Sequence, residues 1–85
     1  MKGERSWKAS QERKAWERAQ VLAAVERGPR TSTDLRDDLA ARIGTMDRVT
    51  DTITGCRRLG LVTTAPIPGK LGYTVTITDA GRDEL

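Results

Sequence analysis

Residues 45–62 read TMDRVTDTITGCRRLGLV, and this stretch decides the fold. Its apolar residues recur at helical spacing: Val49, Ile53 and Cys56. With polar residues on the opposite side, this pattern predicts one amphipathic helix over about 45–59. Gly60 follows the helical pattern and tolerates the left-handed backbone with which many helices end. β-Branched residues begin at Val62, so we expect the helix to run directly into a strand.

A longer helix is predicted upstream, over residues 10–27, and Gly28-Pro29 ends it. Four residues are expected to form its inner apolar stripe: Ala15, Ala19, Leu22 and Val25. Trp16 lies at the margin of this stripe. It is expected to form the edge of the core or, as the alternative, to anchor a partner surface. Residues 1–9 are basic and are expected to be a flexible or helical extension of a single domain at 10–85.

The hydroxyl-rich run 31–34 ends in an acid and predicts the start of another helix, over residues 32–42. Further along, the pattern changes from helical spacing to alternation. This change predicts a β-hairpin with strands near 61–66 and 72–78. Thr78 is then expected to cap a short helical turn. The sequence thus predicts an α+β fold with three helices, a two-stranded hairpin and a short C-terminal helical turn.

The composition of the 85 residues limits the chemistry. One Cys and no His exclude the usual metal and nucleophile sites, so neither a cofactor nor an enzymatic activity is expected. Cys56 falls on the apolar side of its helix and is expected to be a buried small hydrophobic residue. The net charge is +3 and is uneven, because the first 30 residues carry an excess of +4 and the other 55 carry −1. Any attraction to a polyanion is therefore expected from the N-terminal segment.

The sequence also lacks features of other protein classes. No apolar run is long enough to span a bilayer, and the N-terminus has no apolar signal-peptide region. The low cysteine content fits a reducing compartment, so we expect a cytoplasmic protein with no membrane association. Three aromatic residues and a small aliphatic core leave little room for a pocket, so no small-molecule effector is expected.

The order of elements resembles the winged helix-turn-helix domain of MarR-like and PadR-like regulators. Three segments of about 22–85 carry the resemblance. Residues 33–39 match the helix before the turn, Cys56-Arg57-Arg58-Leu59-Gly60-Leu61-Val62 is similar to the family's Leu-x-x-x-Gly-Leu-Val exit, and Tyr73-Thr74-Val75-Thr76-Ile77-Thr78-Asp79-Ala80-Gly81 is similar to its Tyr-x-Leu-Thr-x-x-Gly return strand. The chain departs from the family in placing Cys56 where Leu is usual and Gly55 inside the presumed reading helix.

The resemblance implies a sequence-specific double-stranded DNA-binding transcriptional regulator from a bacterium or a phage. The helix at 45–59 would enter the major groove, and the hairpin tip at 68–72 would lie on the DNA backbone. The residues expected to contact DNA are Thr45, Asp47, Arg48, Thr50, Asp51, Thr54, Arg57, Arg58 and Lys70. Among these, Arg48 would pair with guanine and Asp47 would accept from cytosine. The threonines near the helix start and the remaining cations would contact phosphates.

The competing interpretation is a winged-helix module that binds protein without reading DNA, because one fold serves many functions. Asp47 and Asp51 favour it, since they place negative charge on the side intended for DNA. Their spacing to Arg58 also allows partial neutralisation within the helix. A homodimer through the N-terminal helix is a further expectation, with Trp7 or Trp16 available to meet a second copy.

Overall fold

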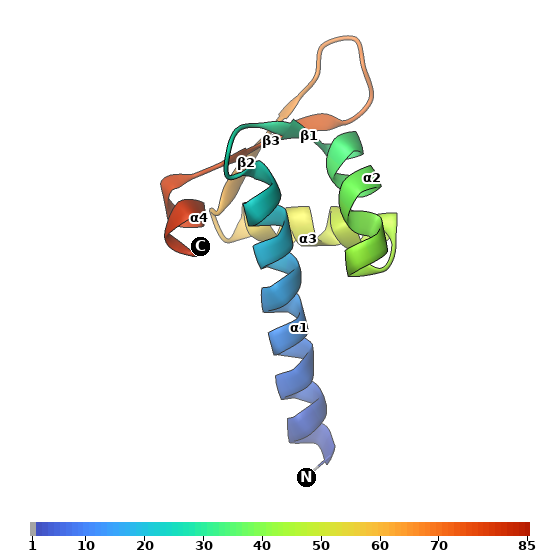
Figure 1. Ribbon diagram of the computed structural model, residues 1–85, viewed down its shortest axis with the longest axis vertical. Helices are drawn as coiled ribbons and strands as arrows, with labels where there is room; N and C mark the ends of the chain where they lie inside the picture. The colour runs from blue at the N-terminus through green and yellow to red at the C-terminus, as the bar shows by residue number, and fades with distance from the viewer. Residues whose placement is uncertain (1) are drawn as a thin grey trace.

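The computed structural model describes the backbone of residues 2–85 and the side chains of residues 7–85, and Met1 lies outside the described residues. Four helices and a three-stranded antiparallel sheet form an α+β fold (Figure 1). In chain order the elements are α1 (Lys2–Val25), β1 (Arg30–Thr31), α2 (Ser32–Ile43), α3 (Met46–Arg58), β2 (Val62–Pro66), β3 (Tyr73–Ile77) and α4 (Asp79–Asp83).

Local capping signals place three of the helix starts. The side-chain oxygens of Thr31, Thr45 and Thr78 each accept a hydrogen bond of 3.1 Å from the backbone N–H three residues further on. These bonds satisfy N–H groups that have no partner within the helix. Gly60 adopts a φ of 75° after the end of α3, which is the left-handed conformation that the sequence predicts there. The predicted hairpin and terminal helical turn are confirmed as β2, β3 and α4.

The prediction of a two-stranded sheet was incomplete. The strand order is β1-β3-β2, in which Arg30 pairs with Val75 and Thr31 with Thr74. Two residues are too few to show the alternation that marks a strand in a sequence. β1 exists because the fold brings this connection beside β3.

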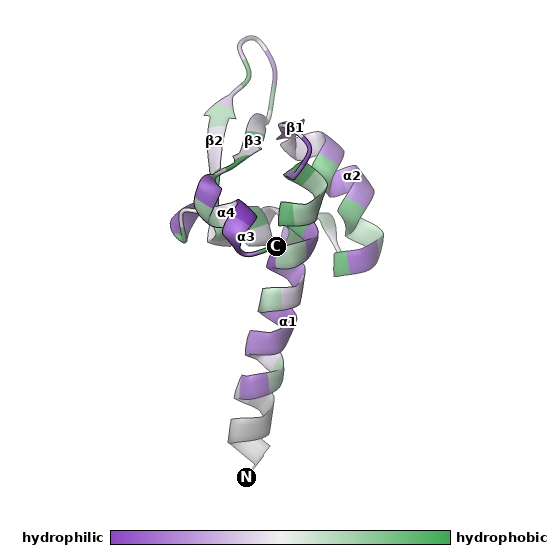
Figure 2. Ribbon diagram, turned by 60° about the vertical axis from the view of Figure 1, so that its left-hand side comes forward, coloured by the Kyte–Doolittle hydropathy of each residue, from purple (hydrophilic) through white to green (hydrophobic). Residues whose placement is uncertain are grey.

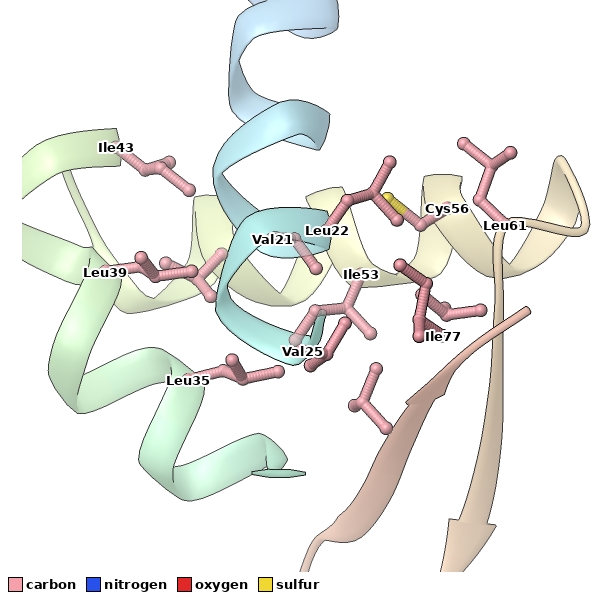
Figure 3. Close-up of a cluster of buried hydrophobic side chains, with 13 residues drawn as sticks. Val21, Leu22, Val25, Leu35, Leu39, Ile43, Ile53, Cys56, Leu61 and Ile77 are labelled. Atoms are coloured by element: carbon pink, nitrogen blue, oxygen red, sulfur yellow. The ribbon is translucent and has the colours of Figure 1, made fainter. Parts of the chain in front are cut away.

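The core is aliphatic and lies where the first three helices meet the sheet (Figure 3). Its thirteen buried apolar residues are Val21, Leu22, Val25, Leu35, Leu39, Ile43, Val49, Ile53, Cys56, Leu61, Val62, Val75 and Ile77. The predicted stripes of α2 and α3 are all present in this set. Burial of this aliphatic surface is the main force that holds the helices and the hairpin together.

The first helix differs from its predicted form. It begins at Lys2, so residues 2–9 take the helical one of the two forms predicted for the N-terminal extension, and its N-terminal half projects away from the rest of the fold (Figure 1). Ala15 was wrongly assigned to the core, because residues 7–16 are all exposed. Trp16 is 39% exposed and lies outside the core, with the Arg13 guanidinium 4.5 Å from its ring centroid. The buried apolar stripe of α1 therefore begins at Val21.

Over residues 7–16, the projecting part of α1 is mainly hydrophilic, with a few weakly apolar positions between the charged ones (Figure 2). It accounts for much of the elongated shape, whose principal extents are 50 × 26 × 19 Å. Across the helices of the described part of the chain, none combines the length and hydrophobicity that a bilayer crossing requires.

The Cys56 thiol is expected to resist alkylation while the protein is folded. Burial raises its pKa from 9.0 to about 11, so it stays protonated at pH 8. The pKa of this thiol is higher in the folded than in the unfolded protein. The protonated thiol therefore contributes fully to the free energy of unfolding below pH 9, and this contribution is lost as the pH rises through 11. Iodoacetamide at pH 8, followed by intact mass, should give one adduct in urea and almost none without it. Rapid labelling of the native protein would contradict this burial.

Candidate functional site

The candidate site is built on α3, which turns one face to the core and the other to solvent. Val49, Ile53 and Cys56 are buried, and helical geometry therefore places Asp47, Asp51 and Arg58 on the opposite side. These three outer residues are exposed. Thr45 fixes the start of the helix by accepting from the Arg48 N–H.

Eight of the nine predicted contact residues belong to α3 or cap it, and they fall into three groups. On or near the outer face lie Asp47, Asp51, Thr54 and Arg58. Towards the hairpin lie Thr50 and Arg57. The third group lies at the start of the helix, where Thr45 is the cap and the Arg48 side chain turns towards α1. The ninth, Lys70, is exposed in the loop between β2 and β3 and is not brought together with the others. The structure thus spreads the predicted residues of α3 over three sides of one helix and leaves the hairpin tip separate from them.

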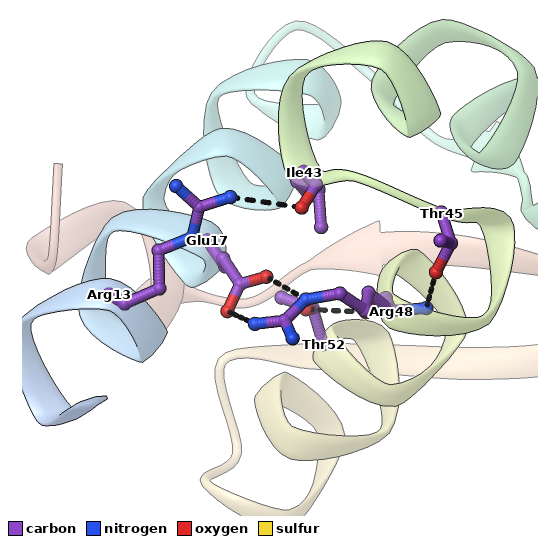
Figure 4. Close-up of polar contacts among 6 residues, drawn as sticks. All are labelled: Arg13, Glu17, Ile43, Thr45, Arg48 and Thr52. Atoms are coloured by element: carbon purple, nitrogen blue, oxygen red, sulfur yellow. Dashed lines mark hydrogen bonds and ion pairs between the residues drawn. The ribbon is translucent and has the colours of Figure 1, made fainter.

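Arg48 makes a two-pronged ion pair with Glu17 of α1 (Figure 4). Its Nε and one terminal nitrogen donate to the two carboxylate oxygens at 3.1 and 3.0 Å. The hydrogen bond with Glu17, together with the attraction between the charges, raises the pKa of Arg48 above its usual value. The Glu17 side chain is 5% exposed, whereas that of Arg48 is 53% exposed. The guanidinium is thus engaged with α1 while one side of it stays open to solvent.

Glu17 did not figure among the residues predicted from the sequence. A signal for it existed, because it lies four residues before the buried Val21 and therefore on the same helical face. A carboxylate on a face that packs inward requires a cation or a donor close by. The sequence alone does not say which cation, because the eleven arginines lie on every element type.

A second contact joins α1 to the turn between α2 and α3. Arg13 donates to the Ile43 carbonyl at 2.9 Å, where the last carbonyls of α2 have no partner within the helix (Figure 4). Together with the Glu17–Arg48 pair, this bond fixes α1 against both ends of that turn. The orientation of α3 therefore depends on α1 as well as on the core.

The threonines of α3 use their hydroxyl protons within the helix. Thr50 donates to the Met46 carbonyl at 3.2 Å, and Thr54 donates to the Thr50 carbonyl at 3.1 Å. Phosphate oxygens only accept hydrogen bonds. Thr50 would have to release its internal bond to contact one. Thr45 differs, because its oxygen accepts from Arg48 and its hydroxyl proton is left to donate.

A groove of about 420 Å³ separates α3 from the hairpin. Its lining consists of Thr50, Ile53, Thr54, Arg57, Thr64, Pro66, Gly72 and Tyr73. One cation and four hydroxyl groups lie among these residues, and none of them carries a carboxylate. The groove therefore has a positive lining without a competing acid, which suits an anion.

The base of the hairpin is held close to α2. Gly72 has a φ of 90°, and a β-carbon there would come within 2.8 Å of the Ser32 hydroxyl oxygen. The adjacent Tyr73 N–H donates to that same oxygen at 3.2 Å. Glycine permits this approach, which fixes the direction in which the hairpin leaves the fold.

Within residues 7–85, the structure brings no three metal-type ligands together. Ion pairs among these residues are also few: Arg30 with Asp38 at 2.9 Å, and Arg48 with Glu17 at 3.0 Å. The predicted intrahelical pairing of Asp47 and Asp51 with Arg58 is not formed there. The outer face of α3 thus presents these charges directly to solvent.

Neither a protein-family model nor a curated protein matches this sequence.

Proposed function

We propose that the protein is a sequence-specific double-stranded DNA-binding regulator with a winged helix-turn-helix fold. In this proposal α3 is the reading helix and the β2–β3 hairpin is the wing. The element order supports it, since three helices precede the hairpin and a short turn at Gly44-Thr45 joins α2 to α3. The width of the DNA major groove, about 12 Å, admits one α-helix.

One observation carries the proposal. The outer face of α3 lies between two grooves, one beside the hairpin and one beside α1. The hairpin groove has Arg57 and no carboxylate in its lining, and Thr64 and Tyr73 add hydroxyl groups that are not committed to bonds within α3. A helix inserted in the major groove has a phosphate backbone on each flank, so cations and hydroxyl groups are suitable on its flanks.

Each residue then has a distinct role. Asp47, with its carboxylate exposed, would accept from a cytosine amino group, and Arg58 would contact the bases or the backbone from the other end of α3. Arg57 would bind a phosphate beside the hairpin. Lys70 would reach a flanking phosphate or the minor groove. Arg48 would read guanine only when its pair with Glu17 opens.

The alternative proposal is a winged-helix module that binds a protein. It is favoured by Asp47 and Asp51, which are exposed and form no ion pair within residues 7–85. Two carboxylates on this face repel a polyanion and would attract a basic protein surface. The two proposals therefore differ in the sign of the partner's charge.

A homodimer through α1 accompanies the first proposal. Residues 7–16 of this helix are exposed, and Trp7 is 66% exposed. A helical stretch of this length is marginal in water without packing. A second copy would cover it, and a two-fold reader would recognise a palindromic site.

DNA binding by the protein is expected to weaken steeply with salt. Each phosphate that the protein neutralises releases counterions. The logarithm of the binding constant then falls with the logarithm of the salt concentration, with a slope of about −0.9 per neutralised phosphate on B-DNA. Fluorescence anisotropy on a random duplex, from 50 to 200 mM salt, gives this slope. Arg57→Gln should reduce this slope, whereas Arg27→Gln, at an exposed position in the turn after α1, should leave it unchanged. Absence of salt-dependent binding, together with capture of a basic protein partner, would favour the alternative.

A further inference from the structure

A second groove, of about 410 Å³, lies on the other flank of α3, between this helix and α1. α1 contributes Lys14, Glu17 and Arg18 to its lining, and α3 contributes Arg48, Asp51 and Gly55. α1 crosses α3 here and continues away from the hairpin (Figure 1). The two grooves thus lie on opposite sides of the same helix.

The charges in this groove do not cancel. Glu17 and Arg48 are paired with each other, at 3.0 and 3.1 Å. This leaves Lys14 and Arg18 against the single carboxylate of Asp51. Neither cation takes part in an ion pair within residues 7–85. The groove therefore carries an excess of one positive charge, placed on α1 rather than on the presumed reading helix.

Gly55 lines an open part of the groove, and a glycine is unusual there because the position lies inside a helix. A glycine inside a helix is less favourable than alanine because its backbone is more flexible when unfolded. A β-carbon at Gly55 would meet nothing within 4 Å, so packing in the chain does not require a glycine there. Gly81 is the opposite case, because a β-carbon there would collide with the Leu61 carbonyl oxygen. The absent side chain at Gly55 therefore leaves the α3 backbone open to a group from outside.

We propose that the α1–α3 groove seats one phosphate of the DNA strand that flanks α3 on the side opposite the hairpin. Lys14 and Arg18 are its ligands, and Gly55 gives the sugar–phosphate chain room beside the helix. This inference rests on the proposed function, since a helix in the major groove lies between two backbones. It makes α1 a second contact arm and gives a role to two of the eight cations among the first 30 residues.

The test measures the salt slope of duplex binding for Lys14→Gln/Arg18→Gln, with Arg27→Gln/Arg42→Gln as a control of equal charge. The groove variant should flatten the slope by about 0.9, the value for one phosphate, and weaken binding to all sequences alike. The control, with its substitutions at exposed positions elsewhere, should match the unmodified protein. Circular dichroism and thermal midpoints should be unchanged in both, because neither pair of side chains is buried.

Gly55→Ala provides an independent measurement. It should keep or raise the thermal midpoint while lowering DNA affinity several-fold, because the added methyl group narrows the groove.

If the unmodified protein binds DNA and both groove variants behave like the control, the inference is wrong and the proposed function stands. If the unmodified protein shows no salt-dependent DNA binding, the proposed function itself fails. A change of sedimentation behaviour in the groove variants, without loss of DNA affinity, would assign the groove to a second copy and overturn the inference.

Discussion

Replacing Gly81 with alanine is expected to destabilise the fold by about 1–3 kcal/mol, or more if the backbone cannot move. Gly81 is buried in α4, where a β-carbon would collide with the Leu61 carbonyl oxygen and lie 2.8 Å from a side-chain carbon of Ile77. That carbonyl accepts from the Thr78 N–H at 3.0 Å, so it cannot retreat without loss of this bond. The collision would separate the start of β2 from the end of β3. Urea unfolding of Gly81→Ala, followed by circular dichroism, measures the loss.

The matched control is Gly55→Ala, the same substitution in another helix. With open space around the new methyl group, it should stabilise the fold by about 1 kcal/mol through helix propensity alone. The two substitutions should therefore shift the urea midpoint in opposite directions. A loss of less than about 0.5 kcal/mol at Gly81 would mean that α4 moves away from Leu61 at little cost, and would contradict its assignment as a fixed part of the fold.

Arg48→Ala is expected to lower the thermal midpoint more than Glu17→Ala does, although both remove the same ion pair. Loss of the arginine leaves a carboxylate that is 5% exposed without its cation, whereas loss of the glutamate leaves a half-exposed guanidinium that water can solvate. The double variant should regain part of the stability that Arg48→Ala loses, because it no longer buries an unpaired charge. Arg42→Ala, at an exposed position of α2, serves as the surface control. Equal losses in the two single variants would contradict this asymmetry.

The same cycle separates two roles of Arg48 in DNA recognition. Selection from a random duplex library would be run with Glu17→Ala and with the double variant. If Arg48 reads guanine, its removal from the Glu17→Ala background should change the preferred base at one position. If Arg48 acts by positioning α3 against α1, the two proteins should select the same site and differ in stability alone.

The sequence by itself determined the features that depend on neighbours along the chain. The hydroxyls of Thr31, Thr45 and Thr78 find their N–H partners three residues away, so the helix starts were predictable. The period change after Gly60 gave the hairpin, and the stripe Leu35, Leu39 and Ile43 gave the buried face of α2. In each case the residues that decide the structure are close together along the chain.

Tertiary structure decided the rest, because the partners are distant in sequence. β1 forms where residues 30–31 meet residues 74–75, and Glu17 pairs with Arg48 across two helices. The apolar pattern of α1 suggested burial at Ala15 and Trp16. It could not show that no apolar surface of the other elements covers these two side chains, which are exposed. The spacing of apolar residues in a helix shows which face of that helix is apolar. It does not show how much of that face another element covers, because this depends on how the elements pack.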